Sequence, residues 1–117
     1  MEAQAIKRHI RSSPRKMRLV IDLIRGKKAK DALNILKLSP QLASHVAEQT
    51  LKSAISNLTN KAFEKEENIY DDQIFVKTVT VDQGVTMKRM LPAPQGRAYR
   101  IRKRSNHLTI VVATKEN

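Results

Sequence analysis

The side chains in this chain that could do chemistry are mostly cationic. Its 117 residues include 23 Lys and Arg against 11 Asp and Glu, which gives a formal net charge of +12. Arginine and lysine side chains neutralise phosphates and release their counterions, so a surplus of this size in a small chain indicates a polyanionic partner. The composition therefore predicts nucleic-acid binding.

The cations are concentrated in two segments. Residues 7–30 carry ten Lys or Arg against one acid, Asp22, and residues 83–115 carry eight against none. Residues 31–82 between them carry five basic and eight acidic side chains. A generic soluble surface intersperses both signs, so this separation indicates two basic surfaces flanking a mildly acidic body, not a uniformly solvated basic protein.

The residue types that catalysis and metal binding require are absent or scattered. There is no cysteine, and the three histidines, His9, His45 and His107, do not have the spacing of zinc ligands. The three glycines form no loop that could cradle a phosphate. The sequence therefore predicts no enzyme, no metal and no cofactor.

The aromatic content narrows the kind of nucleic acid. Proteins that read single strands stack bases on exposed aromatic rings, and the basic segments contain only Tyr99, so structured RNA or duplex DNA remains. A helix-turn-helix around Gly26 would favour DNA, but its second helix carries Asp31, Asn34 and Lys37 and lacks a basic recognition face. A membrane-surface protein is a further alternative, although the basic segments lack an exposed apolar face.

Three helices are expected in the first half of the chain. A capping serine and Pro14 in the first turn begin one helix, which Gly26 ends. A second is expected from Asp31 to Lys37, and a third, capped at Ser39-Pro40, continues for about 20 residues. The apolar sets expected in the core are Met17, Val20, Ile21 and Ile24 in the first helix and Ala43, Val46, Ala47, Leu51, Ala54, Ile55 and Leu58 in the third.

Two extended segments follow. Residues 74–81 are β-branched or aromatic at nearly every position, as strands prefer. Alternate residues of a strand share a face. In residues 97–113, one face is polar at its start and apolar at its end, with the order Arg100, Arg102, Arg104, Asn106, Leu108, Ile110 and Val112. Three successive arginines cannot enter a small core, so the first half of this segment must meet solvent or a partner.

Antiparallel pairing of these two segments would make a β-hairpin over residues 74–113 with a tip at about 83–96. At about 3.3 Å per residue, residues 97–113 could span about 55 Å, so we expect the hairpin to protrude. The alternative is a disordered basic loop. The expected fold is a single α+β domain over residues 1–117, with three helices packed on a small antiparallel sheet and a long protruding β-hairpin.

Location can also be predicted from the sequence. The longest apolar runs are far shorter than the roughly 20 residues that span a bilayer, and MEAQAIKRHI contains no apolar signal core. We therefore expect neither a membrane-spanning segment nor a targeting peptide, and we expect the chain to stay in the cytoplasm.

Motifs distributed over nearly the whole chain resemble one ribosomal protein family. They are RSSPRKMRLVIDLIRGKKAKDAL, then SAISN, then VDQGVTMKRMLPAPQGRAYRIRKRSNHLTIVV. The most specific parts are DLIRGK, MKR before a proline, and GRAxRIxKR followed by a histidine and an apolar strand. Together they are similar to the family of the twenty-second protein of the bacterial large ribosomal subunit.

The resemblance implies a structural constituent of the large subunit in the cytoplasm, which binds large-subunit ribosomal RNA, supports assembly and lines the peptide exit tunnel with its hairpin. The implied partners are that RNA, neighbouring large-subunit proteins and the nascent polypeptide, with no membrane and no DNA. The tunnel wall would be formed by Met87, Lys88, Arg89 and Met90. The hairpin would be held in RNA by Lys88, Arg89, Arg97, Arg100, Arg102, Lys103, Arg104 and His107. The body would dock on RNA through Arg11, Arg15, Lys16, Arg18, Arg25, Lys27 and Lys28.

Overall fold

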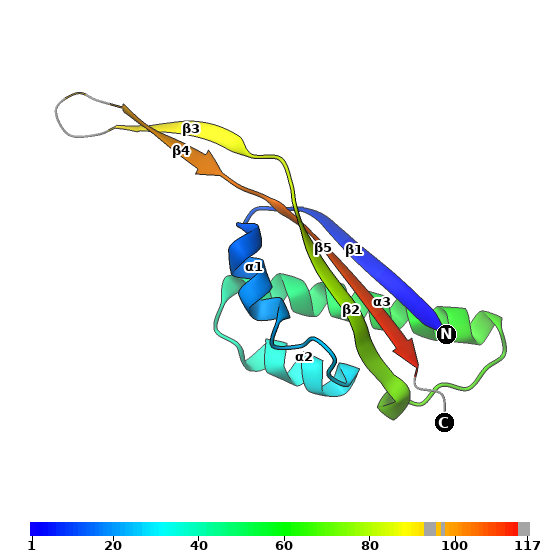
Figure 1. The fold of residues 1–117 in the computed structure, drawn as a ribbon. Coiled ribbons are helices and arrows are strands. Elements are labelled where there is room, and N and C mark those ends of the chain that lie inside the picture. Colours follow the sequence, from blue (N-terminus) through cyan, green and yellow to red (C-terminus); the bar gives the residue numbers. More distant parts are fainter. Residues whose placement is uncertain (93–95, 97, 115–117) are drawn as a thin grey trace.

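The computed structural model describes residues 1–92, 96 and 98–114, and their fold is α+β as predicted (Figure 1). The helices are α1 (Pro14–Ile21), α2 (Ala29–Leu38) and α3 (Leu42–Glu64). The strands are β1 (Glu2–Ile10), β2 (Ile74–Gln83), β3 (Met87–Pro92), β4 (Ala98–Lys103) and β5 (Asn106–Thr114), and a 3-10 turn, η1 (Asp71–Gln73), precedes β2. One antiparallel sheet has the order β1-β5-β2, and β3 pairs with β4 in a separate two-stranded ribbon.

Helix α1 begins and packs as its sequence predicts. The Ser13 hydroxyl accepts a hydrogen bond from the Lys16 N–H at 3.3 Å, and Pro14 occupies the first helical position. The predicted apolar stripe is buried in the core; it consists of Met17, Val20, Ile21 and Ile24. The helix ends at Ile21, and the chain then turns through residues 22–26, where Gly26 adopts a φ of 77° that favours glycine.

The predicted cap of the third helix is wrong. Helix α3 begins at Leu42, and the Ser39 hydroxyl donates to the Ile35 carbonyl at 2.7 Å, at the end of α2. The same Ile35 carbonyl also accepts from the Ser39 N–H at 3.1 Å, so Ser39 closes the end of α2 and its hydroxyl does not cap the next helix. The apolar side of α3 nevertheless packs on the sheet as expected, with Ala47, Leu51 and Leu58 fully buried. Val46 and Ile55, also predicted in the core, are only partly buried. In the described part of the chain, no helix is long and apolar enough to cross a membrane.

Strand β1 was not predicted. It pairs antiparallel with β5, with Ala5 opposite Ile110, and it makes β5 the central strand of the sheet. A bulge between Lys7 and Ile10 shifts this register and places His9 at a φ of 58°. The segment EAQAIKRHI is rich in alanine and charge, which are depleted in strands, and its partner lies at the other end of the chain. No short-range pattern could therefore reveal it.

The long hairpin consists of β2 and β3 running out and β4 and β5 returning, and its β3–β4 part projects from the body (Figure 1). The molecule measures 67 × 26 × 16 Å. Pairing continues as far as Pro92 opposite Ala98, so paired strand extends well into the segment 83–96 that was predicted as the tip. Residues 93–95 and Arg97, the latter a predicted RNA-binding residue, lie outside the described residues.

Candidate nucleic-acid interface

The predicted cations of the body lie on or next to α1. Arg15, Lys16 and Arg18 are exposed on the helix, away from its buried stripe, and Arg11 is exposed in the loop between β1 and α1. The 3.6-residue repeat separates these cations from Met17 and its buried neighbours. One side of α1 therefore belongs to the core, while the other presents positive charge.

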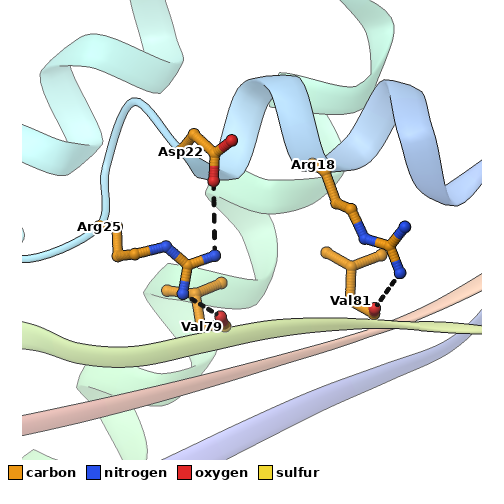
Figure 2. Close-up of polar contacts among 5 residues, drawn as sticks. All are labelled: Arg18, Asp22, Arg25, Val79 and Val81. Atoms are coloured by element: carbon orange, nitrogen blue, oxygen red, sulfur yellow. Dashed lines mark hydrogen bonds and ion pairs between the residues drawn. The ribbon is translucent and has the colours of Figure 1, made fainter.

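Arg18 and Arg25 also bind the body itself (Figure 2). The Arg18 guanidinium donates to the Val81 carbonyl at 3.1 Å, and that of Arg25 donates to the Val79 carbonyl at 2.6 Å. Arg25 also contacts the Asp22 carboxylate at 3.5 Å. Both arginines thus connect the α1 segment to the backbone of β2, a structural role that the sequence did not indicate. A guanidinium has five donors, so this role leaves N–H groups for another partner.

The turn after α1 joins the edge of the sheet through its backbone. The Val76 N–H donates to the Lys27 carbonyl at 2.9 Å, and Lys28 forms an isolated antiparallel bridge with Phe75. The side chains of Lys27 and Lys28 are both exposed. The backbone pairing therefore fixes the position of two exposed ammonium groups beside β2.

The β3–β4 ribbon carries cations on both of its faces. Residues directly opposite in an antiparallel pair share a face. Met87 lies opposite Lys103 and Arg89 opposite Ile101, whereas Lys88 lies opposite Arg102 and Met90 opposite Arg100. The first ribbon face therefore contains Met87, Arg89, Ile101 and Lys103, and the second contains Lys88, Met90, Arg100 and Arg102.

The ribbon has neither a core nor acidic partners. The side chains of Met87, Met90 and Leu91 are at least half exposed, and a two-stranded hairpin is marginally stable in water without a packed face. Residues 83–114 contain no Asp or Glu. Three ion pairs occur among the described residues, and none involves a ribbon cation. The ribbon's charge must therefore be balanced by something other than this chain.

A short segment, which we call the neck, connects the ribbon to the body. It consists of residues 84–86 and 104–105, between the two sheets. The Gly84 N–H donates to the Ser105 carbonyl at 2.9 Å, and the Ser105 hydroxyl donates to the Val85 carbonyl at 2.7 Å. Nearby, the backbone N–H of His9 donates to Nδ1 of the His107 ring at 3.1 Å, which links β1 to the start of β5.

A cavity of about 710 Å³ lies beside the neck. It brings together Arg11 from the body and Arg89, Lys103 and Arg104 from the hairpin, with no carboxylate among its lining residues. The remaining lining residues are His9, Val85, Met87 and Ser105. A cavity with this lining has the charge and the donors to hold a phosphate group.

The chain is similar to known proteins over almost its whole length. Residues 5–113 match the family model of ribosomal protein L22p/L17e. The chain belongs to this family. It is 56% identical to the large ribosomal subunit protein uL22 of Chlorobium phaeovibrioides over 117 residues, which is all of this chain and 97% of the relative. It is 51% identical to the protein of the same name from Bifidobacterium longum over 116 residues, 99% of this chain and 98% of the relative.

Membership of the L22p/L17e family confirms the resemblance found in the sequence. It makes the chain a structural, non-enzymatic constituent of the large ribosomal subunit and so of the cytoplasmic ribosome. Within this member of the L22p/L17e family, the structure brings Arg11 and Arg104 to one cavity, although the sequence assigned them to separate surfaces. Sequence reasoning missed His9, because its position depends on the unpredicted strand β1 and its bulge.

Proposed function

We propose that the chain binds large-subunit ribosomal RNA by neutralising phosphates at three places: the exposed cations beside α1, the neck cavity and both faces of the ribbon. The observation that carries this proposal is the ribbon, which has cations on both faces, no acids and no core. A ribbon of this kind is suited to a narrow passage between RNA segments, where phosphates on both sides balance its charge. Binding to several RNA segments at once would support subunit assembly.

We further propose that residues 87–90 border the peptide exit tunnel and the nascent polypeptide. Each ribbon face offers one methionine and one cation here, Met87 with Arg89 on the first and Lys88 with Met90 on the second. Both methionines are more than half exposed, so each presents a flexible apolar surface. Because the two pairs lie on opposite faces, one pair borders the tunnel while the other contacts RNA.

RNA binding is tested by fluorescence anisotropy of the purified chain with a large-subunit ribosomal RNA transcript and with duplex DNA of equal length. The titrations run from 50 to 300 mM KCl. We expect preference for the RNA to persist at physiological salt, with a log–log salt slope that counts several phosphate contacts. Equal binding that collapses with salt, or sequence-selective binding to DNA, would reject the proposal.

Tunnel contact is tested in reconstituted large subunits with stalled nascent chains. In two separate variants a photo-crosslinking residue replaces Met87 or Met90, one on each ribbon face. The control places it at Leu42, which is 85% exposed at the start of α3. We expect crosslinks to the nascent chain from one of the two ribbon positions and none from position 42. Crosslinks from all three positions, or from none, would contradict the assignment of residues 87–90 to the tunnel.

A further inference from the structure

The end of the body opposite the neck has the reverse charge. Strand β2 runs from Ile74 at that end to Gln83 at the neck, so the connector between α3 and β2 lies far from the ribbon (Figure 1). Residues 64–72 carry five carboxylates against one cation, Lys65. In a chain with a net charge of +12, this acidic end is poorly suited to face phosphate.

A groove of about 520 Å³ lies between this connector, α2, α3 and the start of β2. Its apolar lining includes Leu33 and Ile55, which are only half-buried, and Tyr70 is 67% exposed beside them. Two charged side chains, Lys30 and Asp72, also line it. Asp72 makes no ion pair with any of the described residues. The groove therefore combines an incompletely covered apolar surface with an available carboxylate.

We propose that this groove binds an arginine- or lysine-rich segment of a neighbouring protein. The aliphatic part of such a side chain would cover Leu33 and Ile55, and its cationic head would reach Asp72. The exposed ring of Tyr70 offers a cation a favourable face. Lys30 in the lining and Lys27 and Lys28 beside the start of β2 oppose this binding, but the five carboxylates of residues 64–72 outnumber these three cations.

Charge favours a basic protein segment here over RNA. At physiological ionic strength the screening length is about 8 Å, so the distant cations of the ribbon do not offset the local acids. A phosphate near the connector would be repelled, whereas a guanidinium would be attracted. The inference rests on the proposed function only for its setting among ribosomal proteins, because the binding chemistry belongs to a different surface.

The test is a ¹⁵N chemical-shift titration of the full chain with a blocked peptide of sequence GRLRLRG. The matched probe contains citrulline in place of arginine, which keeps the shape and removes the charge. We expect the arginine peptide to shift the amides of Leu33, Ile55 and Tyr70 and the citrulline peptide to have little effect. Asp72→Asn should weaken the affinity for the arginine peptide by about tenfold. Glu67→Gln, which removes a connector acid outside the groove lining, should change that affinity by less than about twofold.

Two outcomes would overturn the inference: peptide affinity that Asp72→Asn leaves unchanged, or an RNA stem-loop that shifts the groove amides and displaces the peptide. The same variants separate this inference from the proposed RNA function. The Asp72→Asn variant should keep its affinity for ribosomal RNA. The variant with both Arg100→Ala and Arg102→Ala should lose RNA affinity and keep its affinity for the arginine peptide. Each proposal can therefore fail without the other.

Discussion

At the scale of single residues, Asn106 connects the hairpin to the body. Its side chain is fully buried, and its Nδ2 donates to both the carbonyl and the hydroxyl of Ser12 at 2.9 Å. These bonds fix the start of β5 to the loop between β1 and α1. Asn106 is also the first residue of β5, and the buried apolar residues of that strand follow it. It therefore marks the boundary between the core and the basic ribbon.

We expect Asn106→Ala to lower the free energy of unfolding by about 1–3 kcal/mol, because it removes a buried donor and leaves the Ser12 carbonyl without that bond. Ser12→Ala should have a smaller effect, since the carbonyl acceptor remains. Urea denaturation followed by circular dichroism measures both effects. An unchanged dependence of the unfolding free energy on urea concentration would show that each variant exposes the same surface on unfolding. A larger effect for Ser12→Ala than for Asn106→Ala would contradict this account.

Gly84 in the neck is constrained by its neighbour. A Cβ at this position would lie 2.4 Å from the Ser105 hydroxyl oxygen, which would have to rotate away and lose its bond to the Val85 carbonyl. Gly84→Ala should therefore destabilise the fold by about 1 kcal/mol, the net contribution of one hydrogen bond.

A double-mutant cycle tests whether Gly84 and Ser105 are coupled. If the lost Ser105 bond causes the effect, Gly84→Ala should cost clearly less in a Ser105→Ala background than in the parent chain. Thermal or urea unfolding of the four proteins gives the coupling energy. Strict additivity would mean that the new methyl group acts through another contact, such as the His107 ring at 3.3 Å.

At the scale of elements, the ribbon's second face should hold RNA without stabilising the body. Replacing Arg100 and Arg102 with Ala removes two exposed cations from that face. We expect weaker RNA binding and a log–log salt slope shallower by about 1.4–1.8, since each lost phosphate contact contributes about 0.7–0.9. Adding Arg104→Ala at the neck should weaken RNA binding further and make the salt slope shallower still.

The matched comparison uses the first ribbon face, where Arg89→Ala with Lys103→Ala also removes two cations. Both pairs of substitutions should leave the helical circular dichroism signal and the midpoint of unfolding of the body unchanged. If either pair lowered helicity, the ribbon cations would contribute to the fold, and the separation between ribbon and body would be wrong.

Helix α1 is held on β2 by arginines that also contribute to the basic surface. Arg25→Lys keeps the positive charge but removes the planar fork that reaches Val79 and Asp22 together. Because the Arg25 side chain is 49% exposed, we expect a loss of only about 1 kcal/mol in stability, measured by urea denaturation. RNA affinity should stay within about twofold of the parent. A large loss of RNA affinity with unchanged stability would assign Arg25 to RNA instead.

At the scale of the whole molecule, the parts that could be predicted are those in which local pattern determines structure. The apolar stripe of α1 and the change of character along β4 and β5 need only periodicity, and both are found as expected. Strand β1 and the neck cavity depend on contacts between the two ends of the chain, such as His9 with His107. A single sequence contains no local signal for such contacts, so the cations were predicted but their convergence was not.

Stability should be unevenly distributed over the molecule. The body has an aliphatic core beneath a three-stranded sheet, whereas the ribbon depends on the hydrogen bonds between β3 and β4. Hydrogen exchange in the isolated chain should therefore be slow in β5 and fast in β3 and β4, because exposed ribbons open at little free-energy cost. Mass spectrometry of peptides covering β3, β4 and β5 resolves the difference.

Binding to ribosomal RNA should remove this contrast. When phosphates balance the ribbon's cations, β3 and β4 should become protected while β5 changes little, since it is already held by the core. The Arg100→Ala and Arg102→Ala variant is the control, because it should show less added protection at equal RNA occupancy. Slow exchange of β3 and β4 before RNA is added would mean that the ribbon is stable on its own, and that its charge does not couple its order to binding.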